Sequence, residues 1–258
     1  MNRVYYYEDD RLKIFESLAR YEFARPYVKG AVVLDIGCGA RKGPLLLSQN
    51  AKEVVGSDIS KEAVSYCNRK WRAPNIKYLV SDALDLPFGD SVFDVVLAFE
   101  VLEHIGQQAQ LLKEVRRILK KDGLFILSTP NRTIMSPQGV FQNPDHVREF
   151  DAAELKRLLS GVFSNVELYG QKPSSRVDEV LECRKRSYEN VIRIPVFFRR
   201  FLPKSWRELL FKKYISHIAR KNKFCRQEDI SKSDFSISVD HVNEAHYLIA
   251  LCRGIVNE

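Results

Sequence analysis

Short, continuous apolar runs recur along this chain, and most of them end in an acid or a glycine. Runs of four to seven apolar residues bounded by polar ones are typical of buried parallel strands. We expect strands over residues 31–36, 53–57, 76–80, 93–98, 124–128, 163–169 and 245–251.

Between these runs, apolar residues recur at a spacing near 3.6, which predicts amphipathic helices. Ser60 and Asp151 are suitable N-caps, and Glu154 can complete a capping box with Asp151. Lys120 and Lys121 would close the last turn of a helix, where cations favour the dipole. The expected helices cover residues 8–28, 43–50, 61–71, 107–120 and 152–160.

This alternation predicts an α/β fold, a Rossmann-like doubly wound sheet of seven strands with helices on both faces. With 258 residues the chain is long enough for one domain. We expect a helical cap at 1–29, the core at 30–170, a basic helical insertion or lid at 171–240 and the final strand at 241–258.

Composition indicates a protein with a packed core and without disulfide bonds. Hydrophobic residues make up 45% of the chain, yet no apolar run approaches the roughly 18 residues of a membrane span. The first ten residues lack the apolar stretch of a signal peptide. The five cysteines form no C-x-x-C pair, so we expect neither a metal site nor a disulfide framework. We therefore expect a cytoplasmic protein.

The net charge of +8 is concentrated late in the chain, since residues 184–226 hold 14 basic and 2 acidic side chains. Within them, 192–220 mixes lysine and arginine with apolar residues at helical spacing. Three interpretations stay open: a lid packed on the core, peripheral contact with an anionic membrane carrying a lipid-linked substrate, or contact with RNA phosphates.

The ends of the first two strands carry the first candidate chemistry. Gly37 and Gly39 lie two and four residues after Asp35, which allows a tight turn and close approach of a ligand to the backbone. The G-x-G-x-x-G motif of dinucleotide-binding proteins would need glycine where Lys42 stands, which weakens the hypothesis of an NAD site. Asp58 ends the second strand, where an acid commonly accepts from ribose hydroxyls.

Together, D-x-G-C-G at 35–39, D-x-S at 58–60 and E-V-L-E-H at 100–104 resemble the class I S-adenosylmethionine-dependent methyltransferases. The resemblance covers about residues 30–170, and H-V-R-E-F at 146–150 resembles the branch that tailors small molecules and glycans. It implies S-adenosylmethionine as cofactor and an antiparallel last strand. One departure is Arg41, where the family usually has glycine; Gly43 could supply the flexibility instead.

The resemblance also implies a role for each residue of the crevice. Gly37, Cys38 and Gly39 would face the ribose and methionine portion, with Cys38 as a small residue and not a nucleophile. Asp35 would orient the amino group, and Asp58 would hold the ribose hydroxyls. The implied adenine and floor contacts are Asp82, Ala83, Ile59, Leu84, Phe99 and Glu100.

Two histidines are candidate general bases for an oxygen acceptor, although each could equally have a structural role. His104 follows the fourth strand and His146 follows the fifth, so both loops should face the crevice. The resemblance of H-V-R-E-F implies O-methylation of a small-molecule or glycan- or lipid-linked acceptor. The alternatives are an RNA methyltransferase, suggested by the pI near 9.2, and a non-catalytic cofactor-binding protein if Arg41 blocks the crevice.

Overall fold

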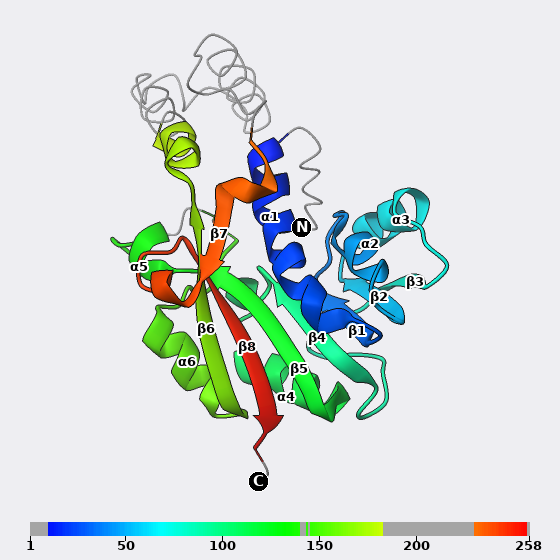
Figure 1. The fold of residues 1–258 in the computed structure, drawn as a ribbon. Helices are drawn as coiled ribbons and strands as arrows, with labels where there is room; N and C mark the ends of the chain where they lie inside the picture. The colour runs from blue at the N-terminus through cyan, green and yellow to red at the C-terminus, as the bar shows by residue number, and fades with distance from the viewer. Residues whose placement is uncertain (1–9, 140–142, 144, 183–229, 257–258) are drawn as a thin grey trace, which may run out of the picture.

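The computed structural model describes residues 10–139, 143, 145–182 and 230–256 as one eight-stranded sheet covered by helices on both faces (Figure 1). The strands are β1 Val32–Ile36, β2 Glu53–Asp58, β3 Ile76–Val80, β4 Phe93–Phe99, β5 Leu119–Pro130, β6 Phe163–Pro173, β7 Phe235–Ser238 and β8 Tyr247–Ile255. The helices are α1 Arg11–Ala24, α2 Gly43–Ser48, α3 Lys61–Lys70, α4 Gln108–Ile118, α5 Arg132–Met135 and α6 Ala152–Ser160, with 3-10 turns at Arg25–Val28, Leu102–His104, Lys232–Asp234 and Val239–His241.

The strand order is β3-β2-β1-β4-β5-β8-β6-β7. β1 pairs in parallel with both β2 and β4, so the chain reverses its direction of winding between β1 and β4. β8 lies antiparallel between β5 and β6. The expected Rossmann-like, doubly wound sheet with an antiparallel last strand is therefore confirmed, with eight strands in place of seven.

The additional strand is β7, which pairs antiparallel with the end of β6. It lies inside the 171–240 segment that the sequence predicted to be helical, and β6 itself runs on to Pro173. Phe235 is buried against Leu12 of α1, which fixes this edge strand. Residues 175–182 are helical, as expected. The basic 192–220 stretch lies outside the described residues.

Alternation along the central strands divides the core into two layers. Val33 packs with α1 and α2 on one face, whereas the next residue, Leu34, packs with α4 and α6 on the other. This is the pattern of a sheet buried on both faces. Among the described residues, no helix has both the length and the apolar character needed to cross a bilayer.

Most helix boundaries follow the predicted caps. The Ser60 hydroxyl accepts from Ala63 N, and Asp151 and Glu154 form the expected capping box. The helix expected to reach residue 120 instead ends at Ile118. Lys120 belongs to β5, where its Nζ lies 2.7 Å from Asp94 Oδ1 of the neighbouring strand. The sheet partner thus replaces the dipole interaction predicted for Lys120.

Gly43 has a packing role and does not supply turn flexibility as the sequence suggested. A Cβ built on Gly43 would lie 2.0 Å from Cζ of the Tyr21 ring, because α1 crosses α2 at this point. Gly43→Ala should therefore lower the free energy of unfolding by about 2–3 kcal/mol through overpacking. Urea denaturation measures this, with Gly89→Ala as the control because its nearest contact is 3.9 Å away. Equal effects of the two substitutions would contradict the packing role.

Candidate functional site

A cavity of about 800 Å³ opens at the carboxyl ends of β1, β2 and β4, where the winding reverses. Ligands of open α/β sheets bind at this position. Most of the predicted residues line it: Gly37, Gly39, Asp58, Ile59, Asp82, Ala83, Phe99, Glu100, His104 and His146. The topology therefore brings together residues that are spread over more than 100 positions of the chain.

The glycine turn after β1 has the geometry that the sequence predicted. Gly37 and Gly39 have φ of 67° and 58°, in the left-handed region that favours glycine. Cys38 N donates to Ser57 O at 2.9 Å, which holds the turn against the end of β2.

Asp58 is fixed by two backbone N–H groups. Gly39 N donates to its Oδ2 and Ser60 N donates to its Oδ1, both at 2.8 Å. Each carboxylate oxygen keeps a further lone pair, and Asp58 lines the cavity. The carboxylate is thus held in place and retains the capacity to accept from a pair of vicinal hydroxyls.

Asp82 and Glu100 extend this polar lining. Asp82 is exposed, and its Oδ1 accepts from Leu84 N at 2.9 Å. Glu100 adopts a φ of 58°, unusual for a residue other than glycine, and its carboxylate accepts from Ser128 Oγ at 2.7 Å. Such a backbone conformation persists only where neighbouring structure enforces it.

Three residues predicted to contact the cofactor do not line the cavity. Asp35 is buried, and its Oδ2 accepts from the Tyr21 hydroxyl at 2.7 Å. Cys38 is buried, and its neighbour Cys67 together with burial raises the pKa of its thiol well above the usual range, which makes it a poor nucleophile. Leu84 is partly buried and packs against the core. None of these three residues lines the cavity.

Asp35 should make stability depend on pH. Burial raises its pKa to about 7, against the opposing effects of the Tyr21 hydrogen bond and of Arg41. This pKa lies above the unfolded value near 3.9. The contribution of the protonated Asp35 carboxyl to the free energy of unfolding is therefore complete below about pH 4 and is lost as pH rises through 7. The free energy of unfolding of Asp35→Asn, relative to that of the wild type, should therefore rise by about 2–4 kcal/mol from pH 4 to pH 8. Urea denaturation at both pH values checks this, and a constant difference would contradict it.

Helix α1, predicted as a cap, also contributes side chains to the site for which the sequence predicted no role. Lys13, Glu16 and Arg20 line the cavity together with Tyr247 of β8. Lys13 Nζ lies 3.1 Å from Glu16 Oε2 and 3.0 Å from the Tyr247 hydroxyl, and Arg20 Nη1 donates to Gln171 Oε1 at 2.7 Å. The i, i+3, i+7 spacing of the three charged residues is the signal that could have placed them on one face.

Arg41 lines the cavity without closing it. Its Nη1 donates to Ser17 Oγ of α1 at 3.3 Å, so its guanidinium lies toward the helical cap. The side chain that replaces the family's usual glycine therefore links the turn to α1.

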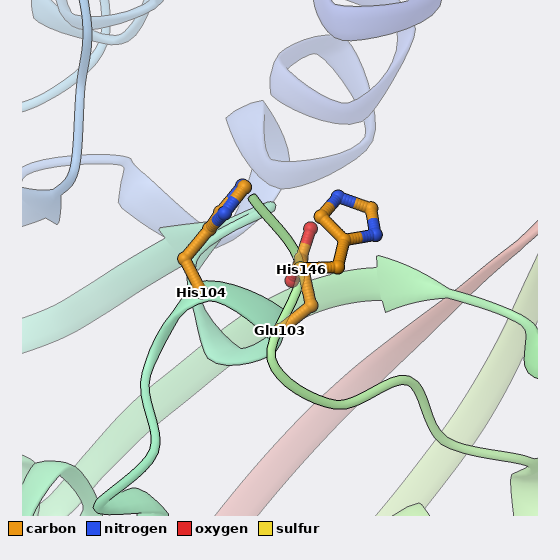
Figure 2. Close-up of side chains that lie close together, drawn as sticks. All are labelled: Glu103, His104 and His146. Carbon is orange, nitrogen blue, oxygen red and sulfur yellow. The ribbon is translucent and has the colours of Figure 1, made fainter. Parts of the chain in front are cut away.

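The two histidines also line the cavity and lie close to each other (Figure 2). Their rings lie 4.8 Å apart at the centroids with the edge of one facing the other. His104 Nδ1 lies 3.1 Å from Asp145 O, and His146 Nδ1 lies 2.6 Å from Glu149 Oε1. Glu103, which the sequence analysis did not select, is buried beside them, and burial next to Glu100 raises its pKa well above the usual range.

S-adenosylmethionine carries a charged amino-acid head, a ribose diol and an adenine ring, and the cavity offers complementary groups. The held carboxylate of Asp58 suits the diol, and the glycine turn permits close approach of the backbone. Ile59 is 62% exposed and lines the cavity, so its apolar side chain is accessible for contact with an aromatic ring.

Comparison with known proteins agrees with this chemistry. Residues 34–127 match the family model described as a methyltransferase domain. A Mycolicibacterium smegmatis protein named as a probable S-adenosylmethionine-dependent methyltransferase is 37% identical over 139 residues, 54% of this chain and 53% of that protein. A fatty-acid O-methyltransferase of the same species is 31% identical over 105 residues, 40% of this chain and 38% of that protein.

The fold is also found in solved structures. A crystal structure of an S-adenosylmethionine-dependent methyltransferase from Archaeoglobus fulgidus superposes with a TM-score of 0.58 at 19% identity, covering 96% of this chain and 99% of that chain. This chain spans about half the length of the curated relatives that it matches.

Proposed function

Because this chain carries a class I S-adenosylmethionine-dependent methyltransferase domain, we propose that it transfers the methyl group of S-adenosylmethionine to an oxygen atom of a small-molecule acceptor, of glycan or lipid-linked type. The observation that carries the proposal is the shared cavity, which the glycine turn, Asp58 and the two histidines line together. The similarity to a fatty-acid O-methyltransferase supports oxygen as the acceptor atom.

When bound, the cofactor supplies a methyl group that is already activated for in-line displacement. The protein then has to align the acceptor, exclude water and accommodate the loss of a hydroxyl proton. His104 and His146 are the candidate general bases that line the cavity. The adjacent carboxylate of Glu149 fixes the ring of His146, as carboxylates do for catalytic imidazoles.

The test is transfer of radioactive methyl from labelled S-adenosylmethionine to separate pools of lipids, oligosaccharides and RNA. Label in the lipid or oligosaccharide pool, lost in Asp58→Ala, supports the proposal. Label in RNA alone would favour the RNA methyltransferase alternative, which rests on the basic 184–226 segment. Cofactor binding without label in any pool would favour the non-catalytic alternative.

As part of the same proposal we place the protein in the cytoplasm, with peripheral membrane contact through 192–220 when a lipid-linked acceptor is presented. The free, buried thiols of Cys38, Cys67 and Cys252 suit a reducing compartment. Sedimentation with vesicles containing anionic lipid, compared with neutral vesicles, tests the membrane contact.

A further inference from the structure

Glu103, His104 and His146 line the same cavity and lie close together (Figure 2). Each offers one ligand atom, a carboxylate oxygen or a ring nitrogen, and these atoms lie within 4.8 Å of one another. The first two residues belong to the 3-10 turn after β4, and His146 comes from the loop that follows α5. A backbone hydrogen bond joins the two segments: Val147 N donates to Glu103 O at 2.8 Å.

Hydrogen bonds orient the two histidines in the way that is typical of metal-ligating histidines. His146 Nδ1 lies 2.6 Å from the Glu149 carboxylate, and His104 Nδ1 lies 3.1 Å from the Asp145 carbonyl. With the proton held at Nδ1 by these acceptors, the lone pair of each imidazole is at Nε2. A histidine ligand typically donates its other ring N–H to a carboxylate or a backbone carbonyl in this way.

The carboxylate of Glu103 provides an independent indication. Its side chain is 0% exposed, and its Oε2 accepts from Thr129 Oγ1 at 3.1 Å. Its Oε1 is buried and has no hydrogen-bond partner among the described residues. A buried oxygen in this situation is costly and calls for an explanation such as a bound ion. The carboxylates of Glu100 and Glu149 also line the cavity, so a cation would reduce the repulsion among them.

We propose that Glu103, His104 and His146 bind a divalent first-row transition-metal ion such as Mn²⁺, Fe²⁺, Co²⁺ or Zn²⁺. Two imidazoles and one carboxylate, with further positions open to water or substrate, are a ligand set suited to these ions. The expectation of no metal site rested on the spacing of the cysteines. This site uses no cysteine and requires residues about 40 positions apart to meet in the fold.

Binding requires a small rearrangement. Metal–nitrogen and metal–oxygen distances of about 2.0–2.2 Å place neighbouring ligand atoms about 3 Å apart. The three atoms must therefore draw together from their present spread of up to 4.8 Å. His104 is exposed and can make this movement, while Glu103 is fixed by burial.

The role of the ion rests on the proposed function. An acceptor hydroxyl bound at an open position would become more acidic, as metal-bound water does. Its O–H bond breaks and the proton passes to solvent water. The oxygen then forms the O–CH₃ bond as the S–CH₃ bond of the cofactor breaks, and S-adenosylhomocysteine is released. The bound ion thus takes over the activation of the hydroxyl that the proposed function gives to the histidines, which serve here as its ligands.

The test is titration of chelator-treated full-length protein with Co²⁺, followed by the visible d–d absorption and by calorimetry. We expect one ion per chain and at least tenfold weaker binding in Glu103→Gln and in His104→Asn. His104 is exposed, so its substitution leaves the core intact. The control is His241→Asn, a histidine that does not line the cavity, which should bind as the wild type does.

Calorimetry with S-adenosylhomocysteine on the same variants separates the two proposals. We expect its affinity to stay within about twofold in His104→Asn. No Co²⁺ binding, or binding as strong as that of the wild type in both His104→Asn and Glu103→Gln, would overturn the metal site while leaving the cofactor site standing. His104-dependent Co²⁺ binding in a protein that transfers no methyl group would instead retain the metal site and reject the proposed function.

Discussion

Asp58→Ala should weaken binding of S-adenosylhomocysteine by about 10- to 150-fold, equivalent to about 1.5–3 kcal/mol. The carboxylate is held at the end of β2 by the N–H groups of Gly39 and Ser60, both at 2.8 Å. A ribose diol would use the remaining lone pairs through charge-assisted hydrogen bonds. Calorimetric titration of the folded variant measures the loss.

Two further variants make this result specific. Asp58→Asn keeps the shape of the side chain but loses the charge and one acceptor, so we expect an intermediate loss of affinity. Asp85→Asn alters an exposed acid on the same side of the sheet that does not line the cavity, and should leave the affinity unchanged. An unchanged affinity in Asp58→Ala would refute the ribose role.

Gly37→Ala should have the second large effect, on both stability and cofactor affinity. A Cβ on Gly37 would lie 2.6 Å from Cγ2 of Val101, and the backbone φ of 67° disfavours any Cβ. The strained turn costs about 1–2 kcal/mol, and displacement of Val101 adds a similar amount. Because both residues line the cavity, we expect the affinity for S-adenosylhomocysteine to fall more than tenfold.

Gly30→Ala is the matched control for this substitution. Gly30 has a φ of 70°, yet a Cβ there would meet nothing within 4 Å, and it does not line the cavity. It should therefore show only the cost of the backbone conformation, about 1–2 kcal/mol in urea denaturation, with normal cofactor affinity. Equal losses in the two variants would contradict the role of the contact with Val101.

The strands that position the cavity could be predicted from the sequence because each is a continuous apolar run ended by polar residues. β1, β2 and β4 were placed within one residue of their bounds, and so the crevice residues at their ends were found. β7 was not found, because Phe235–Ser238 is a four-residue strand in a polar stretch. Only its pairing with β6 and its contact with α1 make it part of the sheet.

The misses in the site share a physical cause. Pattern analysis assigns charged residues of a helix to solvent, whereas Glu16 and Arg20 of α1 are buried. Their partners Tyr247 and Gln171 lie more than 150 positions away and are brought close only by the fold. The family resemblance assigned Asp35 to the cofactor, but its side chain bonds to the Tyr21 hydroxyl.

Calorimetric titration of the purified protein with S-adenosylmethionine, S-adenosylhomocysteine and NADH tests most directly whether this cavity is a methyltransferase cofactor site. We predict that the first two bind, each with one molecule per chain, and that NADH does not, because Lys42 stands where a dinucleotide fold needs glycine. Binding of NADH, or of none of the three, would contradict the assignment of the cavity.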